Sequence, residues 1–153
     1  MQPAPLAPPG PGLALARGVC RHLRGLGFAT LTEFVPAPGM RVDVAGLGPK
    51  GEIWIVECKS CRADYAADRK WPGYLGYCDR FFWAVDAAFP AATLPAGSGL
   101  ILADPYDAAI IALPSAAALA AGRRRALVQR FARTAAERLA QLTDPGPERR
   151  FLP

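Results

Sequence analysis

The chain has 153 residues, 52% hydrophobic and 20% charged, and this composition predicts one globular domain and excludes a disordered chain. A net charge of +5 favours a polyanionic partner, although a modest excess identifies none by itself. No segment has the length of a membrane span or the pattern of a signal peptide, so we expect a cytoplasmic protein with no membrane partner.

The chain opens with a proline-rich leader at residues 1–12, which has nothing to bury and is expected to be mobile. Apolar side chains at helical spacing then predict an amphipathic helix over residues 13–26. Three arginines, Arg17, Arg21 and Arg24, lie on the opposite face of this helix. This arginine-bearing face of the helix either binds a phosphate backbone or is simply exposed to solvent.

Three strands are predicted next, over residues 28–35, 41–47 and 52–59. The third, EIWIVECK, is almost entirely apolar and rich in β-branched and aromatic residues, so we expect it to be central and buried on both faces. A tight turn at residues 48–51 joins the second and third strands into a hairpin.

The second half of the chain continues the α/β pattern. A helix is expected over residues 62–77, with a kink or restart at Pro72. Further strands are expected at residues 80–85, 100–103 and 109–113, with a loop at 87–98 between the first two. A last helix, capped by Ser115, is expected to run to about residue 142, with an interruption allowed at Gly122. Residues 144–153 form a tail, so a single domain spans 13–143.

The apolar third strand ends in two charged residues, Glu57 and Lys59. Residues two apart in a strand point to the same face, so these side chains are neighbours on one side of the sheet. The hairpin turn brings Asp43 opposite Glu57, within about one residue of register.

Two adjacent carboxylates repel each other, and a divalent cation relieves that repulsion. Hard oxygen ligands suit Mg²⁺ or Mn²⁺, and a neighbouring Lys59 could then orient a water molecule or stabilise charge on a phosphate. Glu33, on the first strand, could add a third carboxylate to Asp43 and Glu57. This combination predicts hydrolysis at phosphorus.

Two alternatives compete with this interpretation. Glu57 and Lys59 could form an ion pair at a strand end, with Asp43 solvated in the hairpin. The cysteines offer a zinc or redox site, since Cys58 and Cys61 form a CxxC motif that Cys78, with Cys20 or His22, could complete.

Asp43 followed by Glu57-Cys58-Lys59 on the next strand resembles the PD-(D/E)xK, restriction-endonuclease-like superfamily. The segment 51–85, GEIWIVECKSCRADYAADRKWPGYLGYCDRFFWAV, resembles more narrowly the MmcB-like DNA repair proteins of alphaproteobacteria. The similarity extends through GLILAD at residues 99–104 and the final helix. It covers nearly the whole chain after the leader.

The resemblance implies a mixed β-sheet flanked by helices, with an α-β-β-β-α-β core, in a bacterial protein that repairs DNA. It implies that Asp43 and Glu57 bind the metal ion with the Cys58 carbonyl as a further ligand, and that Lys59 is catalytic. It also implies that Glu33 is the acidic residue preceding the motif aspartate and that Lys70 is a polar residue beside the site.

We therefore expect a Mg²⁺-dependent nuclease that acts on DNA, or alternatively a non-catalytic DNA-binding repair module with the same fold. Arg41 and Arg69 join the three arginines of the first helix as candidate DNA contacts. By analogy with other domains of this size, a homodimer and other repair proteins are further expected partners.

Overall fold

Six strands form one mixed sheet whose spatial order, from β1 to β6, is also their order along the chain. The computed structural model describes residues 10–146. The strands are β1 (Ala29–Phe34), β2 (Val42–Leu47), β3 (Ile53–Lys59), β4 (Arg80–Val85), β5 (Gly99–Ala103) and β6 (Ala108–Ala112). The helices are α1 (Pro11–Gly25), α2 (Arg62–Ala67), α3 (Trp71–Tyr74) and α4 (Ala121–Thr143), with 3₁₀ turns η1 (Leu75–Tyr77) and η2 (Ala91–Thr93).

The sheet changes direction at its centre. β1, β2 and β3 are antiparallel neighbours, whereas β3, β4 and β5 run parallel and β6 returns antiparallel. The connection through α2, α3 and η1 carries the chain from the end of β3 to the start of β4, as a parallel pair requires. This crossover places α2 and α3 beside the end of β3.

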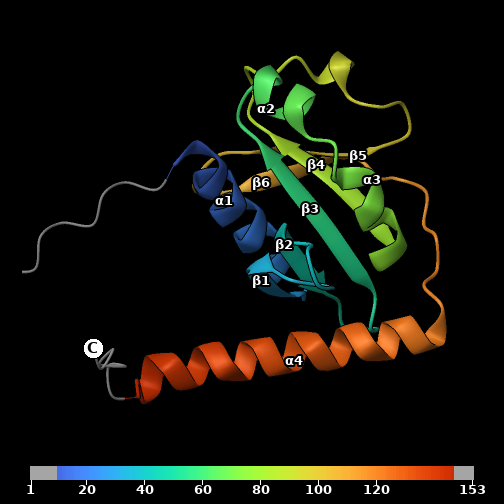
Figure 1. The fold of residues 1–153 in the computed structure, drawn as a ribbon. Coiled ribbons are helices and arrows are strands. Elements are labelled where there is room, and N and C mark those ends of the chain that lie inside the picture. Colours follow the sequence, from blue (N-terminus) through green and yellow to red (C-terminus); the bar gives the residue numbers. More distant parts are fainter. Residues whose placement is uncertain (1–9, 147–153) are drawn as a thin grey trace, which may run out of the picture.

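Helices cover both faces of the sheet, as Figure 1 shows. On one face α1 buries Val19 and Leu23 against Val44, Val56 and Phe82. On the other face the α3 and α4 side chains pack against the opposite side chains of β3 and β4, which include Ile55 and Trp83. β3 is therefore buried on both sides, as its apolar sequence predicts. The expected mixed sheet flanked by helices is confirmed.

Every predicted strand is present to within about two residues of its expected ends. The first helix begins at Pro11 and not at residue 13, because proline is well suited to the first turn of a helix, where its missing N–H is not needed. Residues 1–9 of the predicted leader lie outside the described residues.

The predicted helix at 62–77 is divided into α2, α3 and η1. The break lies at residues 68–70, before Pro72, which occupies the first turn of α3. Pro72 therefore marks a restart, which was one of the two outcomes expected for it.

The last helix begins at Ala121, so the prediction that Ser115 caps it is wrong. Residues 114–120 are instead held in a non-helical conformation by Asp79, whose backbone carbonyl accepts from Ala117 N–H and whose Oδ1 accepts from Leu119 N–H. Gly122 lies in the first turn of α4 and does not interrupt it. Within residues 10–146, no helix combines the length and hydropathy that crossing a bilayer requires.

Asp79 is the anchor that fixes α4 to the sheet. Its carboxylate accepts two hydrogen bonds of 2.6 Å from the guanidinium of Arg124, and its Oδ2 accepts from Ile53 N–H at 2.7 Å. Arg124 also donates to the carbonyl of Gly51 at 2.9 Å. One buried carboxylate thus joins the start of β3, the start of β4 and the first turn of α4.

We predict that Asp79→Asn lowers the free energy of unfolding by about 2–4 kcal/mol, because it leaves Arg124 without its charged partner. Hydrogen bonds from Arg124 lower the pKa of Asp79 to about 2. The contribution of Asp79 is therefore complete above the ordinary carboxyl pKa and is lost as the pH falls toward 2.

Urea unfolding of the wild type and the variant between pH 7 and pH 2 measures this effect. The difference between them should shrink as the pH falls, whereas Asp144→Asn, at an exposed aspartate, should match the wild type throughout. A difference that does not change with pH would contradict the role assigned to Asp79.

Candidate metal centre

The register of β2 and β3 brings two carboxylates together. Val44 pairs with Val56, and continuing that register by one residue places Asp43 opposite Glu57, as the hairpin predicted. At this point, carboxylate oxygens accept the hydrogen bonds that backbone carbonyls accept elsewhere in the hairpin. Asp43 N–H donates to Glu57 Oε1 at 3.0 Å, and Cys58 N–H donates to Asp43 Oδ2 at 2.8 Å. The two strands therefore separate at this point, with the carboxylates between them.

The environment of this pair disfavours two negative charges. Glu57 is only 4% exposed, and Asp43 is partly buried. Burial, and then the charge of Asp43, raise the pKa of Glu57 to about 8. Burial also raises the pKa of Asp43, against the opposing effects of the Cys58 N–H and Lys59. Without a cation, simultaneous ionisation of both carboxyl groups is therefore disfavoured.

Lys59 is held beside the carboxylates by Asp68. Its Nζ lies 2.7 Å from Asp68 Oδ2, and both side chains are nearly buried. The other oxygen of Asp68 accepts from the N–H groups of Lys70 and Trp71, so the same carboxylate organises the break before α3. Burial opposes the ionisation of Asp68, but these hydrogen bonds outweigh it and lower its pKa.

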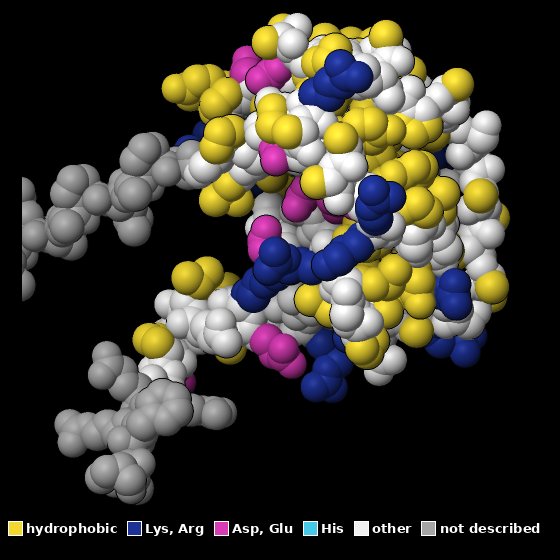
Figure 2. Space-filling model, turned by 45° about the horizontal axis from the view of Figure 1, so that its top comes forward, with side chains coloured by type: hydrophobic (Ala, Val, Ile, Leu, Met, Phe, Trp, Pro, Cys, Tyr) yellow, Lys and Arg dark blue, Asp and Glu magenta, His cyan; other side chains and the backbone are white. Residues whose placement is uncertain are grey.

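These groups line an open cavity of about 800 Å³ between β2, β3, the β1–β2 turn and the α2–α3 segment. In Figure 2, acidic side chains lie within a hollow of the surface and basic side chains follow its lower rim. The acidic and basic side chains that line the cavity are Arg41, Asp43, Glu57, Lys59, Asp64, Asp68, Arg69 and Lys70. A cavity with carboxylates at its base and cations around it suits an anionic ligand together with a bound cation.

The donor set at the base of the cavity fits Mg²⁺ or Mn²⁺. Asp43 and Glu57 are hard oxygen ligands on adjacent strands. Burial raises the pKa of both, and the charge of Asp43 adds to the rise for Glu57, so a nearby divalent cation would favour their ionised forms. Across residues 10–146, no group of three or more His, Cys, Asp or Glu side chains could hold a metal ion. Two carboxylates nevertheless suffice for Mg²⁺, which keeps several of its water ligands.

Glu33 does not join the carboxylate pair, contrary to expectation. Its backbone is left-handed, with φ of 52°, and its Oε2 lies 3.3 Å from Arg41 Nε in an exposed ion pair. Glu33 has no partner in the pairing of β1 with β2, in which Thr32 pairs with Val44 and Phe34 with Val42. This irregularity turns the side chain out of the cavity, although its charge still contributes to raising the pKa of Asp43.

Of the predicted DNA contacts, the structure brings two to the cavity. Arg41 and Arg69 line it, as does Lys70, which precedes α3 and is exposed. The arginines of α1 are also exposed, but α1 covers the opposite face of the sheet and none of them lines this cavity. The α1 arginines and the carboxylates therefore do not form one site.

The cysteines do not gather into a metal site. The side chains of Cys20 and Cys58 are buried under α1, Cys78 is buried in the core on the other face, and Cys61 is exposed. The Cys58 side chain points to the α1 face, although the residue also lines the carboxylate cavity. Metal binding by its backbone carbonyl stays a prediction. The proposed zinc cluster of cysteines with His22 is excluded among the described residues.

The contact between Asp68 and Lys59 was not predicted from the sequence. The available signal was Asp68 preceding Trp71-Pro72, since an acidic residue before a proline-initiated helix commonly caps that helix. Tyr74 is buried and donates from its hydroxyl to the carbonyl of Arg41 at 3.1 Å, which ties α3 to the start of β2.

Comparisons with known proteins agree with this architecture. A family model described as DNA repair protein MmcB-like matches residues 9–146. A solved structure, the SPO1766 protein of unknown function from Silicibacter pomeroyi, is 58% identical and superimposes with a TM-score of 0.90. That match covers 95% of this chain and 100% of the other. No curated protein matches the sequence significantly.

We predict that the metal-free protein loses stability as the pH rises, and that Glu57→Gln abolishes most of this loss. A carboxyl group whose pKa is raised on folding stabilises the protein at low pH, and this contribution is lost as the pH rises from about 4.5 to about 8. Chemical unfolding in EDTA between pH 5 and pH 8.5 should show a decrease of more than about 1 kcal/mol for the wild type.

The matched control is Glu52→Gln, which removes a carboxylate from the hairpin turn and should keep the wild-type pH dependence. If the stability of the Glu57→Gln protein falls as steeply with rising pH as that of the wild type, then ionisation of Glu57 is not the cause of the loss.

Proposed function

The chain belongs to the MmcB-like DNA repair protein family, and from this premise we propose that it hydrolyses DNA phosphodiester bonds with the help of Mg²⁺ or Mn²⁺. One observation carries the proposal: Asp43 and Glu57 lie together at the base of an open cavity, on the same face as Lys59. On this basis we assign the three residues to a D…ExK motif of the PD-(D/E)xK type.

Asp43 and Glu57 would hold the cation, with the Cys58 carbonyl as a further oxygen ligand. Such an ion supplies positive charge that polarises the phosphodiester and eases ionisation of the attacking water. In the reaction the water oxygen bonds to phosphorus, the bond to the leaving sugar oxygen breaks, and that oxygen gains a proton. The products are a phosphomonoester and a free hydroxyl group.

Lys59 would stabilise negative charge within this scheme. As the cation nearest the carboxylates, it can donate hydrogen bonds to the oxygens on which negative charge develops. Asp68 orients its ammonium group, because the two side chains are paired at 2.7 Å and nearly buried. Arg41, Arg69 and Lys70, at the cavity rim, are positioned to bind flanking phosphates.

The same ion pair favours a second candidate function. A lysine engaged by Asp68 at 2.7 Å has fewer donors left for a substrate than a free one. If that pair persists when DNA is bound, the chain would act as a DNA-binding repair module that keeps the fold without cutting. Both candidates place DNA in the same cavity and differ only in chemistry.

We predict that the wild type cleaves some DNA in Mn²⁺, and that Asp43→Asn and Lys59→Met each reduce the rate at least about 100-fold. The measurement is a gel assay across single-stranded, flapped, branched and damaged DNAs. Asp144→Asn and Lys50→Met, which change the same residue types at exposed positions, should retain the wild-type rate.

Circular dichroism establishes that each variant is folded. Calorimetric titration with Mn²⁺ should show saturable binding with proton release near pH 7, and Asp43→Asn should abolish both. DNA binding without cleavage in any divalent ion would favour the binding module over the nuclease.

A further inference from the structure

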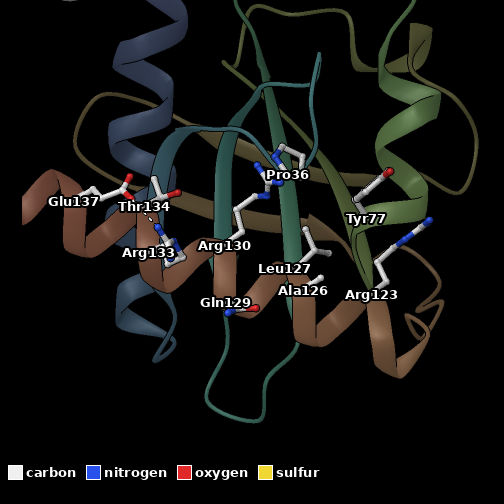
Figure 3. Close-up of a pocket in the computed structure, with 10 residues that line it drawn as sticks. All are labelled: Pro36, Tyr77, Arg123, Ala126, Leu127, Gln129, Arg130, Arg133, Thr134 and Glu137. Atoms are coloured by element: carbon white, nitrogen blue, oxygen red, sulfur yellow. Dashed lines mark ion pairs between the residues drawn. The ribbon is translucent and has the colours of Figure 1, made fainter.

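A second cavity, which the chemistry above does not use, lies along α4. It has a volume of about 580 Å³ and is lined by Pro36, Tyr77, Arg123, Ala126, Leu127, Gln129, Arg130, Arg133, Thr134 and Glu137. Figure 3 shows Arg130 rising from α4 toward Pro36, with Arg123 beside Tyr77 on one side and Arg133 on the other. Three arginines against one glutamate give this α4 groove a net positive charge.

The two flanking arginines each contact a neighbouring group, Arg123 more closely than Arg133. Arg123 donates to the carbonyl of Gly76 at 2.9 Å, and its guanidinium lies 4.6 Å from the centre of the Tyr77 ring. Arg133 has a loose, exposed ion pair with Glu137 at 3.7 Å. Arg130 lies between them, exposed, with no ion pair or hydrogen bond to another described side chain or backbone group.

The α4 groove is adjacent to the carboxylate cavity. The β1–β2 turn lines both, through Pro36 on one side and Gly39 and Met40 on the other. The α3–η1 segment also lines both, through Tyr77 and Tyr74 respectively. Between the two cavities the segments meet, because a Cβ atom at Gly73 would lie 3.4 Å from Met40 Cε. The groove and the carboxylate cavity are therefore neighbours that share two wall segments.

We propose that the α4 groove binds the phosphate backbone of the DNA strand that enters the carboxylate cavity. The inference rests on the proposed function, since it extends the path of the same substrate. Charge complementarity identifies the occupant: guanidinium groups bind phosphate oxygens in a bidentate manner, and a nucleic-acid strand supplies phosphates in a row. The rise from Arg123 to Arg130 along α4 is about 10 Å, which spans roughly three nucleotides of one strand of a duplex.

The consecutive arginines at the start of α4 provide a matched comparison. Arg123 lines the groove and Arg124 is bound to Asp79, whereas Arg125 is exposed and lies outside the groove. Arg130→Gln and Arg125→Gln therefore remove the same charge from the same helix, but only the first removes it from the groove.

The test is fluorescence anisotropy of a labelled single strand, and of the duplex of the same sequence, in EDTA at several salt concentrations. EDTA prevents cleavage, so the full-length protein can be used. We expect Arg130→Gln and Arg133→Gln each to weaken binding about 3- to 10-fold and to reduce the slope of log K against log salt by about 0.7–0.9. The two DNA forms show whether the groove accepts a single strand, a duplex or both.

Arg125→Gln should bind DNA as the wild type does. Equal binding by the Arg130→Gln and Arg125→Gln proteins, on both DNA forms, would overturn the inference even if the wild type cuts DNA in Mn²⁺. Tighter, Arg130-dependent binding of polyglutamate than of DNA would also overturn it, by identifying an acidic protein as the occupant. A wild type that cuts nothing, but whose DNA binding falls with Arg130→Gln, would refute the nuclease and support the groove.

Discussion

The candidate site depends on two hydrogen bonds between backbone N–H groups and the carboxylates of Asp43 and Glu57 at the end of the β2–β3 hairpin. Each carboxylate accepts an N–H group from the opposite strand, Asp43 N–H for Glu57 and Cys58 N–H for Asp43. The side chains thereby take the place of the next ladder bonds, and the strands part to form the base of a cavity. The burial that this requires raises the pKa values of both carboxyl groups, and a divalent cation would relieve that cost.

Two further aspartates, Asp68 and Asp79, hold the segments around the carboxylate pair in position. Asp68 pairs with Lys59 and receives the first N–H groups of the α3 turn, so the lysine and the helix break are fixed together. Asp79 pairs with Arg124 and positions α4, whose arginines form the neighbouring groove. The acids that support the site, Asp68 and Asp79, are each paired with a basic side chain, whereas Asp43 and Glu57 have only backbone N–H partners among the described residues. That contrast distinguishes the carboxylates with a structural role from those to which we assign the metal ion.

The sequence predicted the strands and the register well, because strand signals are local and the hairpin turn fixes the pairing. Asp43, Glu57 and Lys59 could therefore be assigned to one face without a structure. Glu33 was misplaced because a left-handed residue in β1 has no signature in the sequence when it is not glycine. The start of α4 was misplaced because Asp79, about 40 residues earlier, decides it through tertiary contacts. Similarly, nothing local distinguishes Arg123, Arg124 and Arg125, whose three different environments come from distant segments.

The central claim is that the buried carboxylate pair is a site for a divalent cation. Anomalous scattering from a crystal soaked in Mn²⁺ tests it most directly, because it locates the ion without reference to activity. The account predicts a strong peak within about 2.0–2.3 Å of oxygens from both Asp43 and Glu57. A well-diffracting crystal with no peak there, or with Mn²⁺ bound only elsewhere on the chain, would contradict it.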